Sequence, residues 1–323
     1  MEKGLVSIIT PCYNTGKYVH RLLNSILAQD YLMLEVIAVD DGSTDNTLEI
    51  LESFKPSFLS RNIPYTIYKQ GNGGQSVAIN NALKIVKGEF LMWPDSDDYY
   101  NRSDAVSLLV STFRRLPNDY GMIKTLPMFV RESNLEEIKR EYNIDKSENQ
   151  FELALFDKGF IWPPGLNMIS VEALDATNPE REIYTEKRAG QNWQIILPLL
   201  YSYKCYTLEE VLFSVLARQQ SHSRQVSWNY SPQIEMNDVY ERTILNTLDR
   251  IVKMPKEERD KYKKAIRLKY AKQRLFLSCA FGDKEKARKF RKDILNLGKA
   301  LTIKEQVKYS LLCLDLYPFH QGK

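Results

Sequence analysis

Short apolar runs rich in β-branched residues alternate with segments of helical periodicity through the first hundred residues. Strands are expected at residues 5–9, 35–39, 65–68 and 89–93. Helices, in which apolar side chains recur every three or four positions, are expected at 18–28, 44–54 and 75–86. This alternation predicts an α/β fold whose mostly parallel sheet is covered by helices on both faces.

The remainder of the chain changes character twice. Residues 120–232 are less regular, with one clear helical stretch from Gln191 to Tyr201, and helical patterns dominate from about Gln233, with Pro255 placed to begin a helix. We therefore predict one α/β domain followed by a helical appendage. The predicted ranges are 1–110 for a donor half, 111–232 for an acceptor half and 233–323 for the appendage.

Charge is unevenly distributed along the 323 residues. The net charge is +4, yet residues 251–310 contain 19 Lys and Arg against seven Asp and Glu, a local net charge of +12. A basic helical region can contact an anionic membrane surface, and a solvated helix face is the alternative. Nucleic-acid binding would rest on charge alone, and we do not expect it.

The cysteines and the apolar runs indicate the compartment. Four widely separated cysteines without a C-x-x-C pair argue against a disulfide framework and against a thiolate zinc site. No apolar run approaches the ~18 residues that a spanning helix needs. We expect a cytoplasmic protein, with peripheral membrane contact through the basic helices.

Polar residues follow each predicted strand, where an open α/β sheet binds its ligands. Asp40 and Asp41 begin an Asp-Asp-Gly-Ser-Thr-Asp turn, in which a carboxylate can accept hydrogen bonds from a pyrimidine base or from ribose hydroxyls. An ordinary Asp-Gly turn with a helix cap would have the same sequence. Its place directly after a buried strand favours the functional interpretation.

A second acidic turn, Asp95-Ser96-Asp97-Asp98, follows the strand at 89–93. Its hard oxygen ligands suit Mn²⁺ or Mg²⁺ shared with a diphosphate, because these ions keep few protein ligands beside substrate phosphates. Asp clusters also cap helices and form turns. The cation would neutralise the charge that builds on a departing nucleoside diphosphate.

Two further segments could contact an anion or a metal. Asn72, Gly73 and Gly74 precede a helix and can present backbone N–H groups to an anion, although a plain glycine turn explains them equally well. His222 lies in a polar Gln-Ser-His-Ser segment beside Arg218 and is a candidate for a metal or diphosphate contact.

Taken together, Val6 to Asn14, Asp40 to Asp45, Asn72 to Asn80 and Asp95 to Asp98 resemble, in order and spacing, family 2 glycosyltransferases of the GT-A fold. The resemblance is strong over roughly the first 110 residues and weaker to about residue 225. It implies that Thr10, Pro11 and Tyr13 line the base pocket and that Asp41 holds the base. It also implies that Asp95, with Ser96, contacts the donor and that Asp97 binds the metal.

Two departures from the family pattern concern catalysis. Ile79 stands where many relatives have an arginine, and Gln191-Asn192-Trp193 stands where many have Glu-Asp-Trp, whose Asp serves as general base. An amide cannot take a proton at neutral pH. Glu186, just before the expected N-terminus of the helix at 191–201, is the nearest acid. It is our candidate base, followed by Glu182. A surface ion pair of Glu186 with a neighbouring basic residue is the alternative.

These observations predict a metal-dependent, inverting glycosyltransferase. It would move a sugar from a nucleotide diphosphate sugar, a UDP-sugar by resemblance, to a saccharide or lipid-linked acceptor in surface polysaccharide assembly. The rival hypothesis is a nucleotide-sugar-binding module without turnover, motivated by the amides at positions 191 and 192.

Overall fold

The computed structural model describes residues 1–139, 145–186, 188–218 and 229–314. The chain divides into two compact units, Met1–Arg218 and Gln219–Lys323. Each unit contains its own hydrophobic core. The boundary predicted between residues 232 and 233 lies close to the start of the first helix of the second unit. The proposed division of labour between the two regions stays a prediction.

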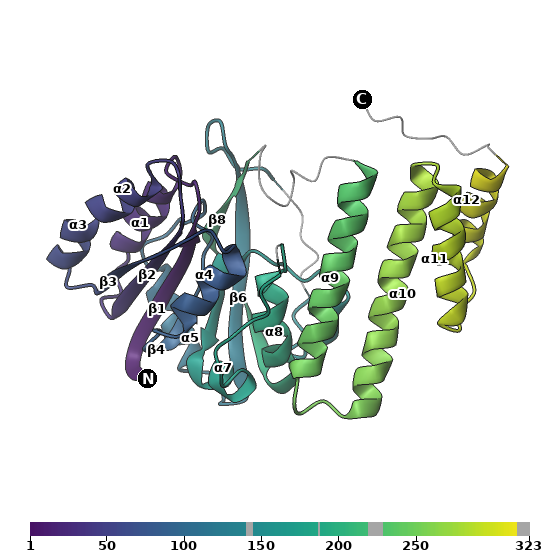
Figure 1. The fold of residues 1–323 in the computed structure, drawn as a ribbon. Coiled ribbons are helices and arrows are strands. Elements are labelled where there is room, and N and C mark those ends of the chain that lie inside the picture. The colour runs from purple at the N-terminus through teal and green to yellow at the C-terminus, as the bar shows by residue number, and fades with distance from the viewer. Residues whose placement is uncertain (140–144, 187, 219–228, 315–323) are drawn as a thin grey trace. The chain divides into compact units, whose positions relative to one another are not determined.

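The first unit is an α/β domain (Figure 1). Its strands are β1 (Glu2–Cys12), β2 (Leu34–Asp41), β3 (Tyr65–Gln70), β4 (Gly88–Met92), β5 (Tyr99–Tyr100), β6 (Tyr120–Arg131), β7 (Asn167–Ser170) and β8 (Lys204–Ala217). Its α-helices are α1 (Val19–Leu27), α2 (Thr47–Ser53), α3 (Lys55–Ser60), α4 (Gln75–Leu83), α5 (Ala105–Phe113), α6 (Phe151–Leu155), α7 (Val171–Thr177) and α8 (Gln191–Ser202). A 3₁₀ turn, η1, spans Pro164–Leu166.

These strands form one sheet in the order β3-β2-β1-β4-β7-β6-β8-β5. Of the seven pairings between named strands in the described ranges, β1 with β2, β1 with β4, β2 with β3 and β6 with β8 are parallel. The other three, which involve β7 and β5, are antiparallel. The predicted α/β class is confirmed, and the parallel strands β1 to β4 bring their carboxyl ends to one edge, where ligands bind in such sheets.

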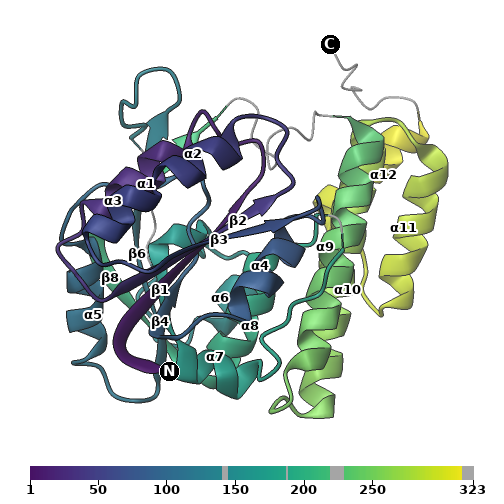
Figure 2. The ribbon, with the colours of Figure 1, turned by 60° about the vertical axis from the view of Figure 1, so that its left-hand side comes forward.

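Helices cover both faces of this sheet (Figure 2). Val6 and Ile8 of β1 belong to a core cluster with apolar residues of α1 and α5. Because successive strand residues point to opposite faces, Ile9 and the buried Ile37 and Val39 of β2 face the other side, against which α4 packs. Burial on both faces explains why these strands read as unbroken apolar runs.

The region that the sequence shows as irregular contains two of the longest strands. β6 contains Lys124 and Pro127, and β8 begins with the largely polar stretch from Lys204 to Glu210. Neither strand therefore shows a regular alternation of apolar and polar residues or a continuous apolar run. The helix expected at 191–201 is α8, Gln191–Ser202. Pairing with neighbouring strands, which no local pattern encodes, decides the structure of β6 and β8.

The second unit is helical in its described part. It consists of α9 (Tyr230–Arg250), α10 (Lys256–Ala280), α11 (Lys284–Asn296) and α12 (Ile303–Cys313). Pro255 is the N-cap residue of α10, as its position suggests. The core cluster of this unit lies where α10, α11 and α12 meet, around Leu275, Phe290 and Leu312. Within the described ranges, none of the helices is both long enough and apolar enough to span a bilayer.

All four cysteines are free thiols. Cys12, Cys205 and Cys279 are buried, as expected for structural thiols, whereas Cys313 at the end of α12 is exposed.

Candidate active site

Two loops at the carboxyl edge of the sheet are joined by hydrogen bonds. Asn14, after β1, has a φ of 50° and donates its backbone N–H to Ser43 Oγ at 3.1 Å. Its side-chain oxygen accepts the backbone N–H of Thr44 at 2.8 Å. Asn tolerates this left-handed conformation better than most residues because its short amide bonds locally. The β1 and β2 turns therefore form one surface.

Asp41 anchors the glycine loop that follows β3. Its Oδ1 accepts the backbone N–H of Gly73 at 2.7 Å and the side-chain amide of Gln70 at 2.8 Å, and its Oδ2 accepts the N–H of Gly74 at 2.9 Å. Only 3% of Asp41 is exposed. The carboxylate that the resemblance assigns to the base thus also fixes the loop, and its contact with a base stays a prediction.

Gly42 permits the same two loops to touch. Its φ is +71°, and a Cβ at this position would lie 2.8 Å from the backbone nitrogen of Asn72. A side chain here would therefore be strained and would also collide with the backbone of the glycine loop. The exposed Asn72 and Gly73 are held against the end of β2, where a donor would bind.

The second acidic turn concentrates negative charge. Asp98 Oδ1 accepts the backbone N–H of Leu216, near the end of β8, at 2.8 Å. Asp95 Oδ1 accepts the amide of Gln75, the first residue of α4, at 2.9 Å. Burial, reinforced by the charge of Asp97, raises the pKa of Asp95 to about 7, and the same causes raise the pKa of Asp98 well above its usual range. Such a cluster favours a bound cation.

One cation of the protein itself already faces this turn. Arg218 Nε lies 2.6 Å from Asp97 Oδ2, and both side chains are largely buried. The guanidinium also lies 4.9 Å from the ring centre of Tyr18, whose hydroxyl donates to Glu132 at 2.6 Å. The guanidinium of Arg218 thus lies between the acidic turn and the start of α1, where its positive charge partly neutralises the carboxylates of the turn.

The donor set fits a divalent cation shared with a diphosphate. Asp97 and Asp95 supply hard oxygen atoms, and burial together with the neighbouring charge of Asp97 raises the pKa of Asp95, a cost that a bound cation would offset. In the described part of the chain, no three His, Cys, Asp or Glu side chains gather closely enough to hold an ion by themselves. The remaining ligands would come from phosphate oxygens and water. His222 lies outside the described residues.

The segment that carries Glu186 is fastened to α4. Asn80 exchanges two hydrogen bonds with the backbone of Ile183, at 2.8 and 2.9 Å, and Ser76 Oγ donates to the carbonyl of Ala189 at 3.3 Å. Glu186 lies between these anchors and accepts the hydroxyl of Tyr184 at 3.0 Å. Because Gln75 at the start of the same helix contacts Asp95, α4 connects Glu186 to the acidic turn.

The amide at position 192 has a structural role. Asn192 Oδ1 accepts the indole N–H of Trp93 at 3.1 Å, and its Nδ2 donates to the carbonyl of Trp162 at 3.2 Å. Trp93, fully buried, directly follows β4 and precedes the acidic turn by two residues. Asn192 therefore joins the end of β4 to the segment that contains Trp162. Gln191 is also buried, and its Oε1 has no hydrogen-bond partner among the described residues.

The residues assigned to the base pocket differ in exposure. Tyr13 is 39% exposed and Pro11 is partly buried, so both can line a ligand site. Thr10 is fully buried, and in the described structure its hydroxyl makes no hydrogen bond. Ser96 is buried beside the Cys12 thiol, whose pKa burial raises to about 12. Thr10 and Ser96 are therefore too buried to contact a ligand at the surface, and their contact with a donor stays a prediction.

The family model described as "Glycosyl transferase family 2" matches residues 7–174, more than half of the chain. The chain belongs to glycosyl transferase family 2. The match contains the second half of β1, the strands β2 to β4, both acidic turns and the glycine loop. The residues at the carboxyl edge of the sheet therefore lie in the part of the chain that matches the family.

Two curated relatives are similar in sequence to part of this chain. The glycosyltransferase GlyG of Streptococcus pneumoniae is 34% identical over 148 residues, which are 46% of this chain and 42% of that protein. The poly(ribitol-phosphate) beta-N-acetylglucosaminyltransferase TarS of Staphylococcus aureus is 42% identical over 98 residues, or 30% of this chain and 17% of TarS. The aligned part therefore spans less than half of either relative.

Solved structures of low identity share the GT-A fold of the family. TarS 1–349 in complex with UDP superposes with a TM-score of 0.60 at 16% identity, covering 99% of this chain and 95% of that one. The mannosyltransferase PcManGT from Pyrobaculum calidifontis, in complex with GDP-Man and Mn²⁺, gives 0.53 at 16% identity, covering 95% and 84%. The predicted GT-A fold with a helical C-terminal region is thereby confirmed.

Several contacts that build this site were not predicted from the sequence. The bridge from Trp93 through Asn192 to Trp162 and the pairing of Gln75 with Asp95 join residues far apart in the chain, and no spacing rule reveals them. Ile79, in place of the family arginine, is buried and brings no charge to the site. The resemblance places Arg218 in a segment near the active site of the family, but it does not predict the ion pair of Arg218 with Asp97.

Proposed function

We propose that the first unit transfers a sugar from a UDP-sugar to a hydroxyl group of a saccharide or lipid-linked acceptor, with metal dependence and inversion at the transferred carbon. The observation that carries the proposal is the joining of two acidic turns and a glycine loop at one edge of the sheet. TarS, which is named as a poly(ribitol-phosphate) beta-N-acetylglucosaminyltransferase, supports a UDP-sugar donor and a polymeric acceptor.

The donor would lie across the β1 and β2 turns. Tyr13 and Asn72 are exposed there. The backbone N–H groups of Gly73 and Gly74 are donated to Asp41, so the glycine loop would shape this surface rather than bind the donor through these two groups. A preformed surface of this kind lowers the entropy lost on binding. Asp95, whose carboxylate accepts the side-chain amide of Gln75, would contact the sugar side of the donor.

The leaving diphosphate would meet Asp97 and Arg218. A divalent cation held by Asp97 would supply Lewis-acid stabilisation of the negative charge that develops on the diphosphate as its bond to the sugar breaks. Arg218, already within 2.6 Å of Asp97, would turn its guanidinium toward the phosphates and add a second positive charge. Asp98, held by the backbone of Leu216, keeps the turn in place.

Inversion in one step needs a base beside the acceptor hydroxyl. Asn192 cannot serve, because it is an amide and both ends of its side chain are hydrogen-bonded to the protein. Glu186, on the segment anchored to α4, is the carboxylate that we assign to this role.

A nucleotide-sugar-binding module without turnover is the second candidate, and the amides at 191 and 192 favour it. The full chain incubated with UDP-sugars, Mn²⁺ and saccharide acceptors is expected to release UDP in proportion to acceptor consumed. Saturable UDP binding without any acceptor-dependent release, across a panel of sugars and acceptors, would establish the binding module instead.

The anchoring role of Asp41 gives a test of the donor site. Asp41→Ala removes the acceptor of two backbone N–H groups and one amide, so the free energy of unfolding should fall by about 3 kcal/mol. Affinity for UDP without metal should fall by roughly tenfold or more, since a charge-assisted hydrogen bond contributes about 1.5 to 3 kcal/mol.

Urea unfolding and isothermal calorimetry measure the two effects of this substitution. Asp30→Ala, at an exposed position outside the site, is the matched control and should change neither. If Asp41→Ala lowered stability but left metal-free affinity unchanged, Asp41 would be an anchor alone, with no part in donor binding.

A further inference from the structure

Helix α12 exposes an apolar stripe along one side. Ile303, Val307 and Leu314, at its start, middle and end, are 86%, 51% and 66% exposed. At 3.6 residues per turn these three positions lie within about 40° of one another around the helix axis. Leu312, on the opposite side, is fully buried in the core formed with α10 and α11. The packing of α12 therefore uses one face and leaves a second apolar face uncovered.

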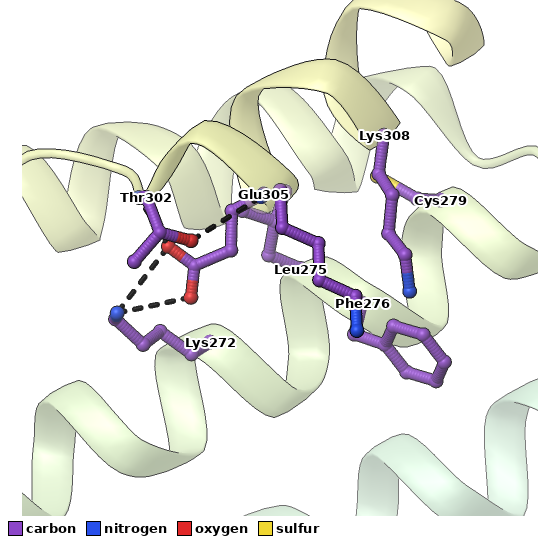
Figure 3. A pocket seen from close by; sticks show the side chains of 8 residues that line it. Lys272, Leu275, Phe276, Cys279, Thr302, Glu305 and Lys308 are labelled. Carbon is purple, nitrogen blue, oxygen red and sulfur yellow. Dashed lines mark hydrogen bonds and ion pairs between the residues drawn. The ribbon is translucent and has the colours of Figure 1, made fainter.

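Two lysines border this stripe. Lys304 and Lys308 lie one turn apart beside the apolar residues and line a cavity of about 340 Å³ between α10 and α12 (Figure 3). Lys308 Nζ lies 4.1 Å from the ring centre of Phe276, which is 41% exposed. Neither lysine forms an ion pair within the described structure.

The nearest carboxylate is already engaged. Glu305 Oε1 pairs with Lys272 at 2.9 Å, and its Oε2 accepts the backbone N–H of Thr302 at 2.7 Å (Figure 3). Thr302 and Glu305 form a capping box that fixes the start of α12. The positive charges of Lys304 and Lys308 thus remain available to an external anion.

We propose that α12 docks on an anionic lipid bilayer, with Ile303, Val307 and Leu314 among the acyl chains and with Lys304 and Lys308 at the level of the lipid phosphates. The net charge of +12 over residues 251–310 complements such a surface. An apolar stripe flanked by lysines is the pattern of helices that lie in a membrane interface.

Other occupants fit the same surface less well. A nucleic acid would use the lysines but would leave three apolar side chains against a polar backbone. A second copy of the chain would bring together two regions of the same high positive charge, which repel each other. The proposal goes beyond the transfer reaction and does not depend on it.

The test is co-sedimentation of the full chain with vesicles of phosphatidylcholine containing phosphatidylglycerol, compared with phosphatidylcholine alone. The wild type should bind the anionic vesicles more tightly. The variant I303S/V307S/L314S should bind them at least tenfold more weakly. The variant K304Q/K308Q should bind them about 25-fold more weakly, at roughly fivefold per lysine, and should show a weaker dependence on salt.

A matched control removes two lysines elsewhere in the same basic region. Lys261 and Lys264 are exposed near the start of α10, about 16 Å and about 12 Å along the helix from Lys272 at the cavity. K261Q/K264Q has the same net charge as K304Q/K308Q and should bind vesicles within about threefold of the wild type. All variants should keep the UDP affinity and thermal stability of the wild type, since every changed side chain lies outside the core and the donor site.

Three outcomes would overturn the proposal. The wild type could fail to bind anionic vesicles. The apolar variant could bind them as well as the wild type while the lysine variant loses both vesicles and generic DNA, which would make the surface a polyanion site. The apolar variant could change the oligomeric state in size-exclusion chromatography, which would make the stripe an interface between copies of the chain.

Discussion

Asp97→Asn is expected to lower kcat about a thousandfold and to abolish the Mn²⁺ dependence of UDP binding. The carboxylate is the best-placed metal ligand, and metal-assisted stabilisation of a leaving group contributes several kcal/mol, at ~1.4 kcal/mol per tenfold. Asparagine keeps the shape of the side chain but removes the charge that faces the largely buried Arg218, so the thermal stability of the variant is measured beside its kinetics. Acceptor-dependent UDP release and calorimetry with and without Mn²⁺ measure both effects.

Asp104→Asn provides the matched control for this substitution. Asp104 is a partly exposed aspartate paired with Arg102 at 2.7 Å, and such surface pairs contribute little. It should leave kcat within about twofold. Turnover of Asp97→Asn close to the wild-type rate, with Mn²⁺ still required, would place the metal on other ligands.

Glu186→Gln is expected to lower kcat by about 10² to 10⁴ while leaving UDP affinity unchanged, because a general base contributes a factor of this size to proton abstraction. The structure favours this glutamate because Asn80 and Ser76 fasten the backbone on either side of it. Gln194 fixes the segment further by accepting the N–H of Tyr184 at 2.5 Å. Steady-state kinetics with saturating donor gives the result.

Glu182→Gln is the comparison, since Glu182 is the next acid on the same segment and is exposed. It should keep most of the activity. A loss under tenfold for Glu186→Gln would assign this side chain to the protein surface, and a larger loss for Glu182→Gln would exchange the two roles.

The first four strands could all be predicted, β3 from the alternation of exposed and partly buried residues in a strand at the edge of the sheet. β1, β2 and β4 are largely buried and therefore appear as nearly continuous apolar runs in the sequence. β1 and β2 are of this kind, with Val6, Ile8, Val36 and Ala38 fully buried. The motifs at their carboxyl ends could be placed on one edge of the sheet for the same reason. The helix α8 was also predictable from its apolar spacing.

The second half of the sheet could not be predicted in this way. β6 pairs with both β7 and β8, and the buried Lys124 in its middle is satisfied by Gln150, twenty-six residues away. Local sequence carries no signal for such a partner. The same holds for the ion pair of Asp97 with Arg218, since the two residues come together only when β8 reaches the acidic turn.

The contact between Gly42 and the backbone of Asn72 also limits how the donor preference of this protein can be redesigned. Any side chain at position 42 would separate the two loops, because its Cβ would lie 2.8 Å from a backbone nitrogen that cannot move without displacing the loop held by Asp41. Mutational libraries aimed at a new nucleotide should therefore keep Gly42 constant. They should vary Tyr13 and Asn72 instead, whose exposed side chains can change without disturbing the backbone beneath them.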